Sequence, residues 1–316
     1  MPGLKEWKAA WPHRIQHSKR YRRPEEFKDQ VSQNFHSTTF TLTGKQNILL
    51  VGAGVTSCDI ARETISIAGK IYQSSRGSPY DIPLSFVPPT VERIGEVASY
   101  ELPYEGQSKP DSVTLTNGRV IKDIDRVILC TGYYFSYPFL LNLHEDSTLP
   151  QDASNTVLVT DGTQIHNLHK DIFYIPDPTL AFVGVPFYTA TFTLFEYQAI
   201  VVAAVFSGHA WLPKENTMRE EYRKRVDTKG YGRAFHSLRE AQVPYVVELL
   251  EWINGQAEVT GAEKIKDYSK WWLEEDKLKL QKMRKRFEVK DANQREVQDN
   301  DEVKKLWGNI LQEIKV

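Results

Sequence analysis

Uninterrupted apolar runs alternate with helical spacing along this chain, and one such alternation is especially clear. The run Ile48–Val51 is apolar at every position, which is typical of a parallel strand covered on both faces. It leads directly into Gly52 and Gly54, and a helix-like spacing follows over 55–68. A second strand, over 70–74, completes a unit of about 30 residues. The pattern predicts the βαβ unit of a doubly wound, Rossmann-like α/β fold.

The segment that follows predicts a small β-meander and then another buried strand. Short strands are predicted over 96–102, 113–115 and 119–121. Asn117-Gly118 joins the last two, and this dipeptide is the strongest short hairpin signal. Residues 127–130 are all apolar, which predicts a buried parallel strand over 126–130 that ends at Cys130-Thr131-Gly132-Tyr133. The proline-rich passage 79–89, before the meander, predicts a loop across a ligand cleft.

Two other segments have patterns that suggest simpler structures. Residues 1–30 lack strong periodicity and predict an extended connector with a short turn at 24–27. Residues 171–184 predict a strand that returns to Gly184, and residues 192–208 predict the helix that follows it. As bare sequence, this is an ordinary buried strand–helix pair.

The C-terminal part of the chain predicts charged helices. From Arg219 onward, apolar residues recur at helical spacing, namely Val246, Leu249, Leu250 and Ile253. The stretch from Lys264 predicts an amphipathic surface helix. The longest apolar run, 199–206, is far too short to span a bilayer. No metal-ligand spacing, nucleophile elbow or internal repeat is present.

Composition places the chain among globular proteins and excludes several classes of function. It has 316 residues, 41% of them hydrophobic and 26% charged, which suits one or two domains. The net charge of −1 gives no electrostatic support for nucleic acid binding. Cys58 and Cys130 lie in apolar surroundings, as expected of buried, reduced thiols. No secretory signal follows Met1, and prolines interrupt the basic N-terminal residues, so a cytoplasmic location is expected.

The turn between the first strand and its helix fits a dinucleotide-binding loop of the G-x-G-x-x-G type. Gly52 allows the tight turn, and Gly54 allows backbone amides to approach a pyrophosphate. The helix N-terminus, with Thr56 in its first turn, supplies partial positive charge for that anion. Ser57 stands at the third glycine position and still permits close helix–strand packing. A tight turn without a ligand is the simpler alternative, but the flanking strands and helix favour a dinucleotide site.

The end of the second strand indicates which dinucleotide is bound. NAD-selective sites carry an acidic residue about 20 residues after the loop, where it binds the ribose 2′-hydroxyl. Here the sequence is Tyr72-Gln73-Ser74-Ser75-Arg76-Gly77, without a carboxylate. Arg76 offers a permanently charged fork for a 2′-phosphate, and Ser75 adds a hydroxyl donor. The sequence therefore predicts NADP, with a solvated surface arginine as the alternative.

A family resemblance begins near the N-terminus. The stretch Trp11-Pro-His-Arg-Ile-Gln-His17-Ser-Lys-Arg-Tyr21 resembles the fingerprint F-x-G-x-x-x-H-x-x-x-(F/Y) of the flavin-containing monooxygenases. His17 and Tyr21 match, whereas Trp11 and His13 replace the phenylalanine and the glycine. Baeyer–Villiger relatives have tryptophan where Tyr21 stands, so the resemblance is to the N- and S-oxygenating branch.

The resemblance continues into the second half of the chain. Cys130-Thr131-Gly132-Tyr133 resembles the family's A-T-G-Y hinge, where the chain leaves the NADP domain, and this places Thr131 and Gly132 near the cofactor. In the family, the segment after that hinge completes the FAD domain, and the helix after the returning glycine lies near the flavin ring. The flavin-facing residues that this implies are Gly184, Thr191 and Phe192.

The resemblance also implies an activity and its cofactors. NADPH would reduce FAD, and the reduced flavin would activate O₂ to oxygenate a small-molecule nucleophile at nitrogen or sulfur. It assigns no catalytic acid or base here. The family's first FAD loop and its active-site asparagine have no counterpart in this sequence, which resembles the family only from a point after them. The alternative is therefore a non-catalytic NADP-binding fragment or a truncated gene product without FAD.

Three parts are expected along the chain. Residues 1–46 form the connector, 47–140 the NADP-binding domain, and 141–316 the remnant of the FAD domain with C-terminal helices. Residues 31–46 are polar, rich in Ser and Thr, and do not fit the family's spacing, so they predict an unstructured insert that packs against nothing. Their ends suit the splice signals of an intron translated in frame.

Overall fold

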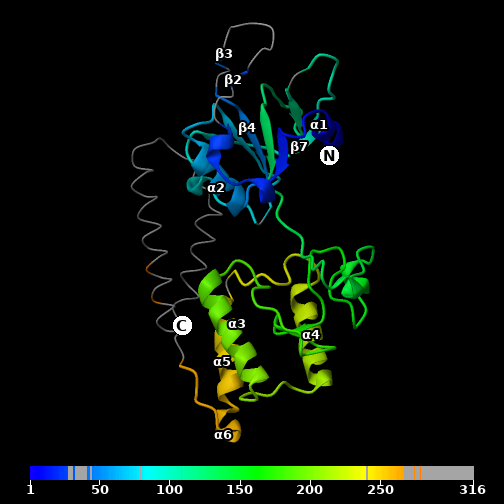
Figure 1. Ribbon diagram of the computed structural model, residues 1–316, viewed down its shortest axis with the longest axis vertical. Coiled ribbons are helices and arrows are strands. Elements are labelled where there is room, and N and C mark those ends of the chain that lie inside the picture. The colour runs from blue at the N-terminus through cyan, green and yellow to red at the C-terminus, as the bar shows by residue number, and fades with distance from the viewer. Residues whose placement is uncertain are drawn as a thin grey trace. The chain divides into compact units, whose positions relative to one another are not determined.

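The computed structural model consists of two compact units (Figure 1). It describes residues 1–27, 45–78, 80–107, 109–239 and 241–266, together with 274, 278 and the backbone at 31–32 and 41–42. Contacts divide the chain into unit 1, Met1–Tyr133, and unit 2, Tyr134–Val316. The division comes directly after the Cys130-Thr131-Gly132-Tyr133 turn.

Unit 1 is built on a five-stranded sheet in the order β1-β10-β4-β5-β6, in which every neighbouring pair is parallel. The strands are β1 Ile15–His17, β4 Ile48–Val51, β5 Ile71–Ser74, β6 Val91–Ile94 and β10 Arg126–Leu129. β4, β5 and β10 confirm the three strands predicted over 48–51, 70–74 and 126–130. β6 was missed because Glu92 and Arg93 interrupt its apolar residues and a proline-rich segment precedes it.

The centre of this sheet is covered on both faces, as the apolar run of β4 predicts. Leu49 and Val51 pack into one buried cluster, which includes Trp7. Ile48 and Leu50 pack into the cluster on the opposite face. Because successive side chains of a strand point to opposite faces, an uninterrupted apolar run suits this central position.

Helix α2, Val55–Thr64, begins at the predicted residue but ends at Thr64 rather than at residue 68. After it the chain turns at Gly69, where an added Cβ would lie 2.6 Å from Asn47 Oδ1 and 2.8 Å from Lys45 O. This close approach explains why the helix stops early: the chain must turn back beside the start of β4 to enter β5.

The predicted β-meander is confirmed. β7 Val97–Tyr100, β8 Val113–Leu115 and β9 Val120–Ile121 form an antiparallel sheet in that order. Asn117-Gly118 makes the turn between β8 and β9, with Gly118 at a φ of 83°. The positive φ is the reason that this turn favours glycine.

The first residues contain more structure than the predicted connector. Helix α1, Leu4–Ala10, buries Trp7 against Tyr100 of β7, with ring centroids 4.9 Å apart. Leu4, Trp7 and Trp11 have the spacing of one helix face, a signal that the sequence contained. β1 then joins the edge of the sheet beside β10.

Short 3-10 helices lie at η1 Ser18–Arg20, η2 Pro24–Phe27, η3 Leu84–Phe86, η4 Leu141–Leu143 and η5 Pro150–Asp152. Of these, η2 confirms the turn predicted over 24–27.

The longest elements that the structure describes in unit 2 are helices. Its helices are α3 Thr191–Phe206, α4 Glu215–Lys229, α5 Gln242–Asn254 and α6 Ala257–Thr260. α3 and α5 lie side by side and share one buried apolar cluster (Figure 1). α3 confirms the predicted helix over 192–208. The charged segment from Arg219 forms α4 and α5, and all the predicted apolar positions are buried on α5.

The strand predicted over 171–184 is wrong. The chain instead forms a short ladder of β11 Leu168–His169 with β12 Phe173–Tyr174, and Ala181 then bridges back to Phe173. Tyr174 O accepts a hydrogen bond from Asp177 N at 3.1 Å, which closes a turn at the Pro-Asp-Pro sequence. Two prolines so close together end a strand, because proline cannot donate to a ladder.

The predicted insert over 31–46 lies largely outside the described residues. β2 Val31–Ser32 pairs antiparallel with β3 Thr41–Leu42. Gln46 is buried, and its backbone oxygen accepts from Gly69 N at 2.8 Å while its side-chain oxygen accepts from Arg126 Nε at 2.9 Å. The prediction of an unstructured insert is therefore wrong at β2 and β3, and the prediction that the stretch packs against nothing is wrong at Gln46. The helix predicted from Lys264 also lies almost entirely outside the described residues.

Two further predictions from composition can be compared with the structure. Cys58 and Cys130 are buried free thiols, as predicted. Burial raises the pKa of Cys130 to about 12 and also raises the pKa of Cys58. Within the described ranges, no helix is long and apolar enough to cross a bilayer.

Candidate dinucleotide-binding site

The cofactor residues predicted in unit 1 meet at one edge of the parallel sheet. Because all five strands run the same way, their carboxyl ends share an edge, and ligands of such sheets bind there. β4 leads into Gly52, β5 into Ser75, β10 into Thr131 through Cys130, and β1 ends at His17. The fold thus brings together loops that are far apart in the sequence.

The loop after β4 makes a tight turn that requires glycine. Gly52 has a φ of 113°, and an added Cβ would lie 2.4 Å from the carbonyl oxygen of Cys130. Its amide donates to Ser74 O at 2.9 Å, which holds the loop against β5. No other residue fits at Gly52, because both the positive φ and the close approach exclude a side chain.

Gly54 serves a different purpose. Any residue can adopt its φ of −81°, and an added Cβ would meet no atom within 4 Å. Neither the backbone nor a neighbouring atom therefore requires glycine here. Gly54 is the N-cap of α2, and no side chain caps this end of the helix. The first amides of a helix have no partner inside it, so here they face open space. Thr56, in the same first turn, is half-buried. This arrangement suits an anion.

Beneath the loop lies a buried polar chain that sequence reasoning missed. Ser57 is fully buried, and its hydroxyl donates to Gly54 O at 2.8 Å. Gln73 of β5, also fully buried, donates to Ser57 Oγ at 2.7 Å. Arg93 of β6 donates twice to Gln73 Oε1, at 3.0 and 2.7 Å. The sequence signal for this polar chain was a glutamine inside a strand that is buried at every position.

In the loop after β5, Arg76 is exposed to solvent, whereas the Ser75 hydroxyl is hydrogen-bonded within the loop. Arg76 is exposed, and it forms no hydrogen bond or ion pair with another residue in the described part of the chain. The Ser75 hydroxyl donates to Asp81, whose carboxylate also accepts from Ser78 N at 3.1 Å. The same hydroxyl accepts from Gly77 N at 3.0 Å. Arg76 therefore remains as the charged group available to a ligand, whereas the Ser75 proton is already used within the loop.

The two fingerprint residues fasten separate segments to the site. Lys19 N donates to His17 Nδ1 at 3.1 Å, so Nε2 carries the proton and donates to Gly132 O at 3.2 Å. Tyr21 donates to Glu63 of α2 at 2.6 Å, and burial, followed by Glu63, raises the pKa of its hydroxyl. His17 thus links β1 to the turn after β10, and Tyr21 links the same segment to α2. Thr131, next to Gly132, is exposed.

Comparisons with known proteins agree with this architecture. The profile of the family described as flavin-binding monooxygenase-like matches residues 106–266. This match covers half of the chain. The chain belongs to the flavin-binding monooxygenase-like family.

The relatives are flavin-containing monooxygenases, which are oxidoreductases. Flavin-containing monooxygenase ustF2 of Aspergillus flavus is 40% identical over 291 residues, which cover 90% of this chain and 56% of the relative. Its homologue ustF1 is 36% identical, covering 88% of this chain and 51% of the relative. The chain therefore spans about half the length of the curated relatives it matches.

Solved structures of flavin monooxygenases share the fold. S-allyl-L-cysteine S-oxygenase from Allium sativum is similar with a TM-score of 0.57 at 21% identity, covering 99% of this chain and 60% of that one. Tmm from a Pelagibacter species is similar with a TM-score of 0.53 at 17% identity, covering 84% of this chain and 49% of that one. At these identities the likeness concerns the fold.

In this flavin-binding monooxygenase-like chain, the predicted flavin-facing residues lie in unit 2. Gly184 has a φ of 95°, and an added Cβ would lie 2.7 Å from the ring of Phe195. Its amide donates to the buried Gln198 side chain at 2.8 Å. Packing within unit 2 thus accounts for glycine at 184. Thr191 begins α3, and Phe192 after it is 91% exposed.

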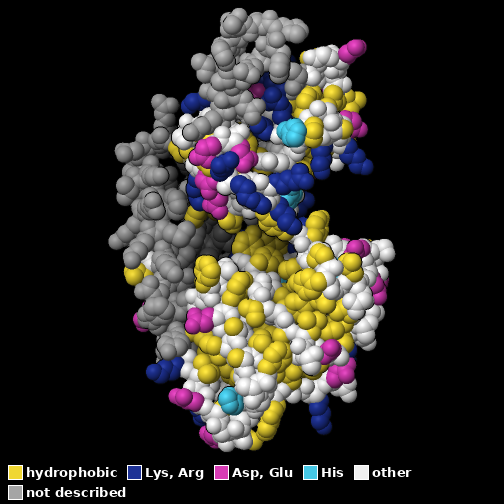
Figure 2. All heavy atoms as spheres, viewed as in Figure 1, with side chains coloured by type: hydrophobic (Ala, Val, Ile, Leu, Met, Phe, Trp, Pro, Cys, Tyr) yellow, Lys and Arg dark blue, Asp and Glu magenta, His cyan; other side chains and the backbone are white. Residues whose placement is uncertain are grey.

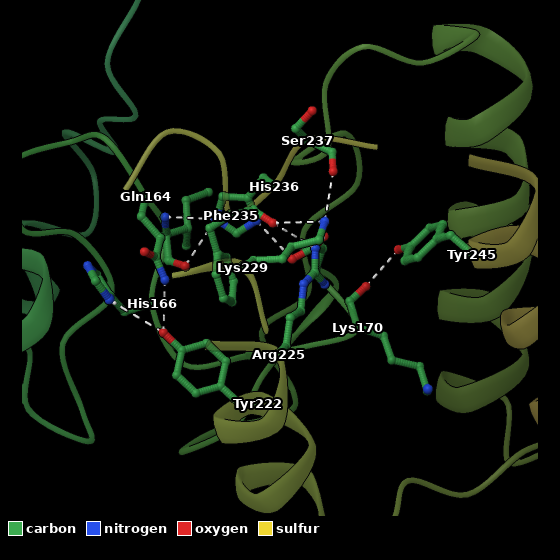
Figure 3. Close-up of polar contacts among 12 residues, drawn as sticks. Gln164, His166, Lys170, Tyr222, Arg225, Lys229, Phe235, His236, Ser237 and Tyr245 are labelled. Atoms are coloured by element: carbon green, nitrogen blue, oxygen red, sulfur yellow. Dashed lines mark hydrogen bonds and ion pairs between the residues drawn. The ribbon is translucent and has the colours of Figure 1, made fainter. Parts of the chain in front are cut away.

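Unit 2 also holds a buried charged network (Figure 3). Asp171 is fully buried, and its carboxylate accepts from His236 Nδ1 at 2.8 Å and from Arg225 Nη2 at 2.5 Å. The other ring nitrogen of His236, Nε2, lies 3.0 Å from Ile165 N and 3.2 Å from Ile165 O. Burial alone would raise the pKa of Asp171, but His236 and Arg225 outweigh burial and lower it. Asp171 is therefore an anion in the folded protein.

The network fixes the segment between α4 and α5. Figure 3 shows Arg225 and Lys229 of α4 pointing at that segment. Lys229 Nζ donates to Phe235 O at 3.3 Å and to Ser237 O at 2.7 Å, and Arg225 donates to Phe235 O at 3.1 Å. Every charged group of the network has a partner, so this arrangement stabilises the fold and offers no proton to a substrate.

Two other histidines of unit 2 are neutral at neutral pH. Burial, assisted by His236, lowers the pKa of His166 to about 4. Burial, assisted by Lys170, lowers the pKa of His169 to about 3. Glu221 Oε2 lies 3.5 Å from His169 Nδ1, but a neutral imidazole forms no ion pair with it. Neither histidine is placed to act as an acid near neutral pH.

Proposed function

We propose that unit 1 binds NADP(H) and that the protein acts within an NADPH-dependent flavin monooxygenase, which oxygenates soft nitrogen or sulfur nucleophiles with O₂. Membership of the family supports the flavin monooxygenase class. The observation that carries the NADP(H) site is the space at Gly54, where a Cβ would meet nothing within 4 Å in front of an uncapped helix end. Amides without partners beside empty space suit a pyrophosphate.

The preference for NADP over NAD rests on Arg76. It is the second residue after β5, at the carboxyl edge of the sheet, where this fold places the group that contacts the adenosine ribose. The exposed guanidinium is uncommitted among the described residues, so it is available for a 2′-phosphate. Asp81 gives the competing possibility, a carboxylate in the same loop that would favour the 2′-hydroxyl of NAD. Its carboxylate is already shared between Ser75 and Ser78, which supports the assignment to Arg76.

Replacing Arg76 should remove most of the preference for NADP. We expect the unchanged chain to bind NADP⁺ more tightly than NAD⁺, and Arg76→Ala to weaken NADP⁺ binding by about 1.5–3 kcal/mol, the contribution of a charge-assisted hydrogen bond. NAD⁺ affinity should stay nearly constant, because NAD⁺ lacks the phosphate. Isothermal titration calorimetry with both nucleotides measures this.

Arg119→Ala is the matched control for the loss of charge. Arg119 pairs with Glu92 on the surface of unit 1, and it lies outside the site loops. Its removal should leave both affinities unchanged. If the unchanged chain binds NAD⁺ as tightly as NADP⁺, Arg76 does not recognise a 2′-phosphate, and Asp81 becomes the better candidate.

The fit of FAD to this chain is weaker than that of NADP. Phe192 offers an exposed ring next to the uncapped start of α3, which supports a flavin contact for Thr191 and Phe192. Gly184 adds no such support, since Phe195 explains it. The sequence also has a single strand–G-x-G–helix unit, and the proposal assigns that unit to NADP. An NADP-binding chain without flavin is therefore the second candidate function.

A visible absorption spectrum distinguishes the two candidates. With one dinucleotide loop present, we expect the purified chain to be colourless and to show little NADPH-dependent oxygen uptake, even after FAD is added. A pyrophosphate without its own glycine loop and helix N-terminus loses most of its anchoring. Flavin that stays bound in equal amount through gel filtration would contradict this expectation, and it would favour a complete monooxygenase site.

A further inference from the structure

Three successive hydrogen-bonded links run beneath the glycine loop. Arg93 donates from Nε and Nη2 to Gln73 Oε1, at 3.0 and 2.7 Å. Gln73 Nε2 donates to Ser57 Oγ at 2.7 Å, and Ser57 Oγ donates to Gly54 O at 2.8 Å. The chain therefore begins at a cation and ends at the peptide that opens helix α2.

The direction of these bonds follows from the chemistry of the side chains. A guanidinium only donates hydrogen bonds, so the Gln73 oxygen must face Arg93 and the Gln73 NH₂ must face Ser57. Ser57 Oγ then accepts one bond, and its single proton is left for the Gly54 carbonyl. Gln73 and Arg93 are register partners on β5 and β6, which places both side chains on one face of the sheet. One arrangement of protons satisfies the whole chain.

This arrangement orients the peptide between Gly54 and Val55. The protein has no cis peptide bond among its described residues, and in a trans peptide the C=O and N–H point in opposite directions. The Gly54 carbonyl faces Ser57 and also accepts from Cys58 N at 3.3 Å. The Val55 N–H must then point away from both, out of the uncapped end of α2. That end is where Gly54 leaves open space.

We propose that Arg93, Gln73 and Ser57 are positioning residues that aim the Val55 amide at the bridging phosphates of the bound dinucleotide. The inference rests on the NADP site proposed for unit 1. Arg93 adds a permanent charge at the far end, and linked hydrogen bonds polarise one another, so the same chain also strengthens the amide as a donor. Ser57, which replaces the third glycine of the motif, gains a role beyond allowing close packing.

Two substitutions break the chain in different ways. Gln73→Glu keeps the length of the side chain and the bonds to Arg93, but it removes the N–H that Ser57 needs. The Ser57 hydroxyl would then donate to the new carboxylate and release the Gly54 carbonyl. Ser57→Ala removes the link itself. Because Gln73→Glu retains a charged pair with Arg93, it should stay folded even if Ser57→Ala does not. Gln107→Glu, in the β7–β8 connection, is the control for the same chemical change elsewhere in unit 1.

Two ligands separate positioning from a general effect on structure. NADP⁺ carries the bridging phosphates, whereas adenosine 2′-monophosphate carries the 2′-phosphate alone. Calorimetric titration of the full chain should show NADP⁺ binding weakened about five- to tenfold in Gln73→Glu and Ser57→Ala. Binding of adenosine 2′-monophosphate should change less than about twofold, and Gln107→Glu should alter neither ligand.

Three results would overturn the inference, and they are distinguishable. If both ligands weaken by the same factor, the chain supports the loop only structurally. If neither ligand weakens in a folded variant, the Val55 amide does not depend on these residues. If the unchanged chain binds neither ligand, the NADP site itself is refuted, and the inference with it. Thermal unfolding of each variant shows which comparisons use folded protein.

Discussion

Replacing Gly52 by alanine should destabilise unit 1 and abolish dinucleotide binding together. The φ of 113° is unfavourable for a residue with a Cβ, and that Cβ would lie 2.4 Å from the carbonyl oxygen of Cys130. The contact is with backbone at the end of β10, so neither side can move without disturbing the sheet. Backbone strain and overpacking each cost about 1–3 kcal/mol, so a loss on the order of 4 kcal/mol is expected. Urea unfolding and NADP⁺ titration measure the two effects.

Gly54→Ala is the matched variant, because it should separate the two effects. With a φ of −81° and no atom within 4 Å of the added Cβ, alanine fits the folded chain without strain. Stability should stay constant or rise by about 0.4–1 kcal/mol through the unfolded state. The new methyl group stands where the phosphates should approach, so NADP⁺ binding should weaken by more than about tenfold, or about 1.4 kcal/mol. If Gly54→Ala binds NADP⁺ like the unchanged chain, the open space at Gly54 is not the phosphate site.

The contrast between these two glycines shows what the sequence could and could not predict. The strand–loop–helix motif identified both positions, because the apolar run of β4 and the spacing of the glycines are local features. The reason for each glycine is not local. Gly52 is required by Cys130, directly after the neighbouring strand β10, which the fold brings beside β4. Gly54 is distinguished by the absence of a neighbour, which no sequence pattern reports.

Errors in the fold arose where a local signal was weak or overlooked. The helical face formed by Leu4, Trp7 and Trp11 was overlooked, because residues 1–30 as a whole lack strong periodicity and therefore suggested a connector. The strand expected over 171–184 failed because its apolar residues suggested an extended run, whereas the prolines at 176 and 178 close a turn inside it. The predicted positions of helices and strands were most accurate where both faces of the element are packed, as in β4, because such packing requires apolar residues at every position.

The hydrogen-bond partners of the polar groups in the site cannot be predicted from the sequence alone. Ser75 looked like a free hydroxyl until the loop brought Asp81 to it. Gln73 looked like one polar residue in a buried strand, yet it connects Arg93 to Ser57. The signal in such cases is a polar residue where burial is expected, because a buried polar group needs a partner. Its partners become known only once strand order and register are known.

The buried network of unit 2 is the extreme case, because its members are far apart in the sequence. Asp171 and Arg225 are 54 residues apart, and Asp171 and His236 are 65 residues apart. Nothing in the local pattern around any of them suggests a charged cluster. The structure shows that the three hold the turn between β11 and β12, helix α4 and the segment before α5 in one arrangement, so the network should contribute strongly to the stability of unit 2.

Asp171→Asn should therefore destabilise unit 2 by about 3–5 kcal/mol, because it leaves Arg225 partly buried without its counter-ion. Asparagine is nearly the same size and tolerates the φ of 58° found at this position, so steric or backbone strain does not explain the loss. Hydrogen exchange read by mass spectrometry measures it locally, as faster exchange over 165–171 and 231–238. Peptides from β4 and α2 in unit 1 serve as the internal reference.

Glu215→Gln provides the comparison with an ion pair on the same helix whose carboxylate is exposed. Arg219 Nε lies 2.8 Å from Glu215 Oε1 in α4, and the Glu215 side chain is 58% exposed. Pairs at this spacing on a helix contribute about 0.3–0.5 kcal/mol, and Arg219 keeps its bond to Asn155 O at 3.2 Å, so exchange in unit 2 should barely change. The two variants each remove one carboxylate charge that is paired with an arginine of α4. A difference of several kcal/mol between them would therefore measure the cost of leaving a buried charge unpaired, and equal effects would show that the network of Asp171 is no stronger than a surface pair.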